Sequence, residues 1–177
     1  MQTAIVAGGC FWRIEAVYNQ IKGVESAVSG YINGHTANPT YADVCSGDTG
    51  HAEAVKIDFD PDTVSYRTLL EILFTLHDPT QLNRQGHDAG TQYRSGIYYL
   101  DEAQKAEAEA FLAEASSHYA APVVTELAPA QTFYPAESYH QGYFRQNSTA
   151  GYCLAVVAPK YLKARSLHAD LWLDSPT

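Results

Sequence analysis

The chain has 177 residues, 46% of them hydrophobic and 18% charged, a balance typical of one globular domain with its own core. Its formal net charge of −9 at pH 7 argues against non-specific binding to nucleic acid or to anionic membranes. No apolar run reaches 18 residues, and no basic segment followed by a long apolar stretch begins the chain, so we expect neither a membrane span nor a signal peptide.

Three cysteines, at positions 10, 45 and 153, form neither a C-x-x-C pair nor a disulfide-rich framework. This usage favours a reducing, cytoplasmic setting with a reactive thiol over a secreted scaffold. The chain also contains no repeat, low-complexity tract or linker, so we assign residues 1–177 to a single catalytic domain.

The apolar run 3–7 predicts a strand, Gly8 and Gly9 a turn, and the following residues a helix that begins at or next to Cys10. The N-terminus of a helix favours thiolate over thiol, because free backbone N–H groups and the positive end of the dipole meet there. Trp12 lies off the predicted core face, so it is a candidate pocket wall. The alternative is that Cys10 is a small buried hydrophobic residue and Trp12 is packing, and this stretch alone does not decide between them.

Residues 24–34 predict a strand that runs into a turn, and a short helix follows residues 38–40. Thr40 and Asp43 have the spacing of a capping box at its start. Tyr41, Val44 and Cys45 share one side of this helix, and we interpret Cys45 as a core thiol.

Residues 51–60 predict a strand in which Glu53 alternates in phase with Val55, Ile57 and Phe59. On this core-facing side, burial would raise the pKa of the carboxyl and keep it protonated at neutral pH. A neutral glutamic acid can donate a proton to a reacting group. The alternative, a solvated Glu53 at a frayed strand end, agrees less well with alternation along the whole strand.

The remaining chain continues the alternation of helices and strands. We expect an amphipathic helix over 65–77, an ordered functional loop over 78–94, strands over 95–100 and 123–127, a helix from 101 to about 117, a helix from Pro135, and a basic helix after residue 159. The order predicts an α+β domain with a mostly antiparallel central sheet and flanking helices, like a ferredoxin-type plait with additions.

A thiolate beside a neutral acid and phenols suits attack on an electrophilic centre whose oxygen must be protonated as its bond breaks. A sulfoxide fits this description, since sulfur is the electrophile and a methyl group can rest against an aromatic face. The enzyme would then carry a sulfenic acid, which a second thiol converts to a disulfide.

Long stretches of the chain resemble, in order and with compatible spacing, the successive motifs of the A-type peptide methionine sulfoxide reductases. The stretches are GGCFWRIEA (8–16), YADVCSGDTGHAEAVKIDFDP (41–61), HDPTQLNRQGHDAGTQYRSGIYY (77–99), AESYHQGYF (136–144) and GYC (151–153). The resemblance covers nearly the whole chain.

This resemblance implies roles for individual residues. Cys10 matches the nucleophile, Glu53 the acid that protonates the sulfoxide oxygen, and Cys153 the resolving cysteine in a C-terminal loop and helix of about residues 146–177. Tyr41 and Tyr93 match the phenols that bind that oxygen. The implied substrate-binding residues are Phe11, Trp12, Asp88, His140 and Tyr152.

The resemblance also implies specificity for the S epimer, in oxidised proteins and in free methionine sulfoxide, and re-reduction by thioredoxin. It implies no metal and no bound organic cofactor, and we expect a monomer. Some relatives carry a second cysteine at the position of Arg13 and another after the GYC motif, so here we expect a single Cys10–Cys153 disulfide. His87 stands where the family commonly has asparagine.

Three other functions remain to be compared. A thiol peroxidase would not need the acid and the phenols, and a non-catalytic domain that binds oxidised peptides would not need Cys153. A metal-binding module could use His51, His77, His87 and His140, but their spacing matches no metal motif. We assign no role to Glu15, Arg13 or His168, which we interpret as dipole-favouring, solvated or locally paired residues.

Overall fold

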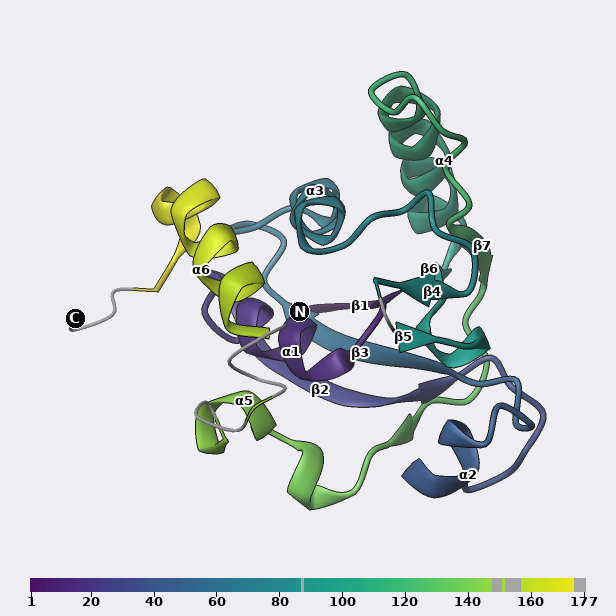
Figure 1. Ribbon diagram of the computed structural model, residues 1–177. Helices are drawn as coiled ribbons and strands as arrows, with labels where there is room; N and C mark the ends of the chain where they lie inside the picture. The colour runs from purple at the N-terminus through teal and green to yellow at the C-terminus, as the bar shows by residue number, and fades with distance from the viewer. Residues whose placement is uncertain (87, 148–150, 152–156, 174–177) are drawn as a thin grey trace.

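The computed structural model describes residues 1–86, 88–147, 151 and 157–173 (Figure 1). The predictions made for His87, Tyr152 and Cys153 lie outside the described residues.

A six-stranded sheet forms the centre of the fold, with the strand order β7-β6-β1-β3-β2-β8. All neighbouring strands pair antiparallel except β6 and β7, which are parallel. The strands are β1 (Gln2–Gly8), β2 (Val24–Ile32), β3 (Ala52–Phe59), β6 (Ser95–Tyr99), β7 (Glu126–Pro129) and β8 (Tyr134–Pro135). The mostly antiparallel sheet predicted from the sequence is therefore confirmed.

The four central strands and two helices form the plait expected from the order of elements. The helices are α1 (Phe11–Tyr18), between β1 and β2, and α3 (Tyr66–Leu76), between β3 and β6. Together they give the order β-α-β-β-α-β, and the spatial order β6-β1-β3-β2 is that of a ferredoxin-like fold.

Both helices bury apolar side chains against the same face of the sheet. Ile14 and Val17 of α1 and Leu70 and Leu73 of α3 are fully buried in one cluster with residues of β1 and β3. Ser65 caps α3 by accepting a hydrogen bond from the backbone N–H of Thr68 at 3.0 Å. The opposite face of the sheet holds a smaller cluster, against which the 128–133 segment packs.

Two further helices pack outside this layer (Figure 1). Helix α4 (Glu102–Ser116) begins at the predicted cap Asp101 and lies against α3, and α6 (Ala158–Leu167) lies against α1 and α3. No helix within the described ranges is long and apolar enough to cross a membrane.

The 78–94 segment is folded, as expected for a functional loop. It contains a two-stranded hairpin, β4 (Arg84–Gln85) with β5 (Asp88–Ala89), and then a 3₁₀ turn over Thr91–Tyr93. The hairpin lies beside the beginning of α1, where Gln85 packs against Gly9.

The predicted helix from Pro135 is wrong. Tyr134 and Pro135 pair with the edge of β2, a 3₁₀ turn follows over Ser138–His140, and only α5 (Tyr143–Gln146) is α-helical. Gly142 between them adopts φ +66°, a left-handed conformation that separates the two helical turns. We refer to residues 136–147 as the strap.

The interpretation of Cys45 as a core thiol is also wrong, because its side chain is exposed. The predicted capping box of Thr40 and Asp43 is present, but the helix that it starts, α2 (Tyr41–Cys45), has only five residues and lies at the periphery. Val44 points into the core, and the next residue lies about 100° around the helix and faces solvent.

Candidate active site

Cys10 occupies the N-cap position of α1 immediately after β1. Gly9 reaches φ +92°, so the chain turns from strand to helix within two glycines. The Cys10 side chain is 5% exposed and does not cap the helix, which leaves the sulfur close to the free N–H groups and the positive end of α1.

Three buried side chains enclose the Gly8–Gly9 turn. A Cβ at Gly8 would lie 2.9 Å from Cγ of His77, and one at Gly9 would lie 2.8 Å from Cγ of Gln85 and 3.0 Å from Nη2 of Arg13. A side chain at either glycine would therefore displace the groups that hold the turn. Gln85 in turn bonds the backbone N–H and carbonyl of Asp78 at 2.9 and 2.6 Å, both within the 78–94 segment, and its packing against Gly9 connects this segment to the turn.

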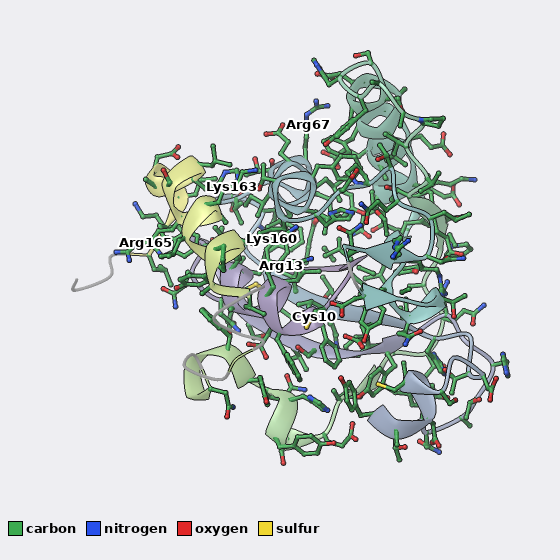
Figure 2. All side chains as sticks on the ribbon, viewed as in Figure 1. Cys10, Arg13, Arg67, Lys160, Lys163 and Arg165 are labelled. Atoms are coloured by element: carbon green, nitrogen blue, oxygen red, sulfur yellow. The ribbon has the colours of Figure 1, made fainter. Side chains whose placement is uncertain are left out.

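Arg13 is buried, so of the two expectations for it, a solvated or a locally paired side chain, only the second agrees with the structure. It is 1% exposed, and its Nη2 donates to the carbonyl of Gly8 at 2.6 Å. Figure 2 shows Arg13 and Cys10 near the start of α1, with Lys160 on the neighbouring α6. His77, which faces this cation, is neutral at pH 7 because burial lowers its pKa to about 4.

A cavity of about 260 Å³ opens over Cys10. Six of its seven lining residues, all except Tyr143, were predicted from the sequence to belong to the site. The lining residues are Cys10, Trp12, Tyr41, Glu53, Asp88, Tyr93 and Tyr143. The fold therefore brings the predicted thiol, acid and phenols to one place, although they come from four separate elements.

Glu53 is buried on the helix-covered face of β3, in phase with Val55 and Ile57 as the alternation predicted. Its Oε1 accepts from the backbone N–H of Phe11 at 3.3 Å, whereas Oε2 has no hydrogen-bond partner in the described part of the chain. Burial raises the pKa of Glu53 to about 8; the N–H of Phe11 opposes this rise and nearby Asp88 adds to it. The carboxyl is therefore protonated at neutral pH.

Tyr41 precedes Glu53 in the sequence and Tyr93 follows it, but both phenols line the same cavity as this carboxyl. Burial raises the pKa of each phenol far above its usual value, and the nearby Glu53 raises it further. Both phenols therefore keep their protons and can donate hydrogen bonds to an oxygen in the cavity.

The aromatic wall is Trp12 together with Tyr143, whose rings stack with centroids 3.8 Å apart and planes 13° apart. The indole Nε1 of Trp12 donates to Nδ1 of His140 at 3.0 Å, which fixes the orientation of the ring. His140 and Phe11 are both buried behind the wall and are not among the residues that line the cavity. Of the predicted substrate-binding residues, Trp12 and Asp88 line it directly.

Sequence reasoning missed two residues that support the wall. Tyr143 was included in a predicted helix but given no role. Glu15 was interpreted as a dipole-favouring residue, yet it is 3% exposed, and its Oε1 accepts from the N–H of Gly142 in the strap at 2.8 Å. The helical spacing of the sequence places Trp12 and Glu15 on the same side of α1. This shared side could have indicated that Glu15 supports the wall.

The described residues contain no cluster of three or more His, Cys, Asp and Glu side chains that could hold a metal ion. Of the histidines considered for a metal module, the three that the structure describes, His51, His77 and His140, instead bond to protein groups. For example, His51 bonds the N–H of Gly34 at 3.0 Å, and His77 bonds the hydroxyl of Ser95 at 2.7 Å.

Comparisons with known proteins agree with this geometry. Residues 2–171 match the family model described as peptide methionine sulfoxide reductase. The chain is 60% identical over 171 residues to the peptide methionine sulfoxide reductase MsrA of Pasteurella multocida, covering 97% of this chain and 98% of that protein. It is 53% identical to the MsrA of Chromobacterium violaceum, with coverage of 97% and 98%.

Solved structures lead to the same family. Methionine sulfoxide reductase A of Corynebacterium diphtheriae is 35% identical with a TM-score of 0.82, over 87% of this chain and 78% of that one. Reduced Mxr1 of Saccharomyces cerevisiae is 33% identical with a TM-score of 0.80, over 86% and 88%. Mxr1 is also known in complex with Trx2, a structure whose chain aligns at 23% identity, with a TM-score of 0.56, over 80% of this chain and 84% of that one.

Replacing Glu53 with glutamine should stabilise the folded protein at neutral pH. The carboxyl ionises near pH 4.5 in the unfolded chain but near 8 in the fold, so unfolding of the wild type releases a proton between these values and becomes easier as pH rises. At pH 7 the variant should avoid a cost of roughly 3 kcal/mol, at 1.36 kcal/mol per pH unit. Urea unfolding at pH 7 and pH 4 measures this, and the difference should vanish at pH 4.

The exposed Glu25 on β2 offers a matched control, since Glu25→Gln should change the free energy of unfolding by less than about 0.5 kcal/mol at either pH. A Glu53→Gln protein no more stable than the wild type at pH 7 would contradict the neutral, buried state of this carboxyl.

Proposed function

This chain belongs to the peptide methionine sulfoxide reductase family, and from that premise we propose that it reduces the S epimer of methionine sulfoxide to methionine, in oxidised proteins and as the free amino acid. The observation that carries the proposal is the neutral Glu53, whose Oε2 has no partner in the described structure and which shares a cavity with Cys10. A proton donor beside a sulfur nucleophile is the pair that sulfoxide reduction requires.

In the first step, the thiolate of Cys10 attacks the sulfoxide sulfur while Glu53 transfers its proton to the sulfoxide oxygen. Tyr41 and Tyr93 donate hydrogen bonds to this oxygen as the charge on it develops. The substrate S–O bond and the transient bond between the two sulfurs then break, and the protonated oxygen forms a new bond to the Cys10 sulfur. Methionine leaves, Glu53 remains as a carboxylate, and Cys10 is a sulfenic acid. The substrate sulfur gains two electrons and Cys10 loses them.

In the second step, the thiol of Cys153 attacks the sulfenic acid sulfur of Cys10 and forms a disulfide with release of water. Two thiols are then consumed for each methionine formed. Cys153 lies outside the described residues, so this assignment depends on the resemblance of the GYC motif. We propose that thioredoxin reduces the disulfide, an assignment supported by the yeast relative Mxr1, which forms a complex with Trx2.

The proposed epimer specificity follows from three fixed contacts around a tetrahedral sulfur. The oxygen faces Glu53 and the phenols, the methyl group rests on the wall of Trp12 and Tyr143, and the rest of the substrate must leave through the mouth of the cavity. Only one configuration at sulfur satisfies all three contacts. The family resemblance identifies it as S.

We further propose that the protein works as a monomer in the reducing cytoplasm and needs no bound metal or organic cofactor. The composition and the isolated cysteines support this location. A thiol peroxidase is the alternative, but peroxide reduction does not explain a neutral acid and two phenols beside an aromatic wall.

A single-turnover assay on reduced protein tests the proposed function. Each epimer of a methionine sulfoxide peptide is supplied separately, and free thiols are counted after the reaction. We expect methionine from the S epimer only, with loss of two thiols per methionine. Intact thiols and no methionine from either epimer would mean that the chain keeps the site without the reaction, and faster turnover of peroxide would favour the peroxidase.

Cys153→Ser should still form one methionine per protein but should lose recycling by thioredoxin, because the sulfenic acid on Cys10 has no internal thiol to attack it. The matched control is Cys45→Ser, which should recycle normally because Cys45 is assigned no part in the reaction. Methionine formed per protein over many turnovers, with thioredoxin and its reductase, measures the difference. Normal recycling by Cys153→Ser would show that another thiol resolves the sulfenic acid.

A further inference from the structure

Glu137 in the strap joins three elements behind the cavity. Its Oε1 accepts from the hydroxyl of Tyr31 on β2 at 2.9 Å. Its Oε2 accepts from the backbone N–H of Tyr41, the first residue of α2, at 3.0 Å, and from the hydroxyl of Tyr139 at 3.2 Å. Glu137 is not among the residues that line the cavity.

Glu137 connects an element that supplies the cavity with one that lies beside it. Tyr41, whose phenol lines the cavity, is the first residue of the five-residue helix α2. This helix is otherwise held by its capping box, by the buried Val44, and by the ring of Tyr41, which stacks against Phe11 and Trp12. Tyr31 is the direct cross-strand neighbour of Glu53 in the β2–β3 ladder, and its ring lies 5.7 Å from that of Phe11. A contact that fixes Tyr31 and the backbone of Tyr41 therefore fixes the phenol relative to the acid.

We propose that Glu137 is a positioning residue, which holds the Tyr41 phenol at the place where the sulfoxide oxygen must bind. The inference rests on the proposed reductase function and adds a residue to it. Val44 and the Tyr41 ring hold α2 against the core, and the hydrogen bond from the first backbone N–H of the helix to Glu137 fixes its start, from which the phenol extends.

The electrostatic environment of Glu137 suits this role and differs from that of Glu53. Burial by itself would raise the pKa of Glu137, but hydrogen bonds from the N–H of Tyr41 and from the Tyr31 and Tyr139 hydroxyls outweigh it and lower the pKa. Glu137 is therefore ionised and accepts all its bonds, whereas Glu53 is protonated and can donate. The same residue type thus serves as an anchor at one position and as an acid at the other.

Glu137→Ala tests the proposal, because it removes both main contacts. The rate of methionine formation in a single turnover at saturating S-epimer peptide should fall about tenfold or more, since small displacements of a catalytic group are costly. Substrate affinity should change less, because the wall of Trp12 and Tyr143 is intact. Thermal unfolding, measured in parallel, confirms that the variant is folded at the assay temperature.

Glu137→Gln should restore the rate to within about threefold of the wild type. Its amide oxygen can accept from the Tyr41 N–H, while its NH₂ group donates to the Tyr31 hydroxyl, which can also act as an acceptor. The matched control is Tyr139→Phe, which removes only the contact of an exposed side chain and should leave the rate within about twofold of the wild type.

A double-mutant cycle with Tyr41→Phe distinguishes positioning from general support of the fold. If Glu137 acts through the phenol, Glu137→Ala should lower the rate of the Tyr41→Phe protein by less than about twofold. The same loss in both backgrounds would overturn the proposal, and so would an unchanged rate in Glu137→Ala alone.

Tyr31→Phe provides a second route if Glu137→Ala does not fold. It deletes one main contact of Glu137 and keeps the ring beside Phe11, so the rate should fall about threefold in the wild-type background and stay unchanged in Tyr41→Phe. Equal losses in both backgrounds would again overturn the proposal. Failure of the wild type to form methionine would instead reject the reductase function itself, so the two failures are distinguishable.

Discussion

The burial of one carboxyl group is the constraint on which the site depends. Glu53 lies in line with Val55, Ile57 and Phe59 on the face of β3 that α1 and α3 cover, so the carboxyl has lost most of its water. Ionisation in such a place is unfavourable, and the group keeps its proton up to a pH near 8. The same burial that costs stability at neutral pH keeps on Glu53 the proton that it transfers in the proposed reaction.

The other parts of the site hold a nucleophile and a wall around this acid. The two-glycine turn after β1 places Cys10 at the beginning of α1, and Arg13, His77 and Gln85 enclose the turn. The strap closes the far side, where Tyr143 stacks on Trp12 and the backbone of Gly142 bonds Glu15 of α1. These contacts are close packing around the turn, a ring stack and a hydrogen bond between segments 127 residues apart. Such a frame keeps the acid, thiol and phenols in place before a substrate arrives.

Much of this architecture could be predicted from the sequence because it depends on local patterns. Alternation along β3 located Glu53, and an apolar run followed by two glycines located Cys10.

Other features depend on tertiary contacts that no local pattern contains. The strap was predicted to belong to a helix that begins at Pro135, but Tyr134 and Pro135 pair with the edge of β2 and the left-handed Gly142 interrupts the helical turns. Cys45 was placed in the core because a five-residue helix gives too short a pattern to define its buried side. The hydrogen-bond partners of Glu137 can be identified only from the folded structure, because Tyr31 and Tyr41 lie 106 and 96 residues away in the sequence.

The most direct test of the account is the pKa of the Glu53 carboxyl in the reduced, substrate-free protein. It can be followed by the carboxyl carbon resonance of protein labelled with ¹³C at glutamate, assigned by comparison with Glu53→Gln. The account predicts a titration midpoint near pH 8, with the carboxyl protonated at pH 6 to 7. A midpoint near 4.5, the ordinary value for glutamate, would show an ionised group at neutral pH and would contradict its role as the proton donor.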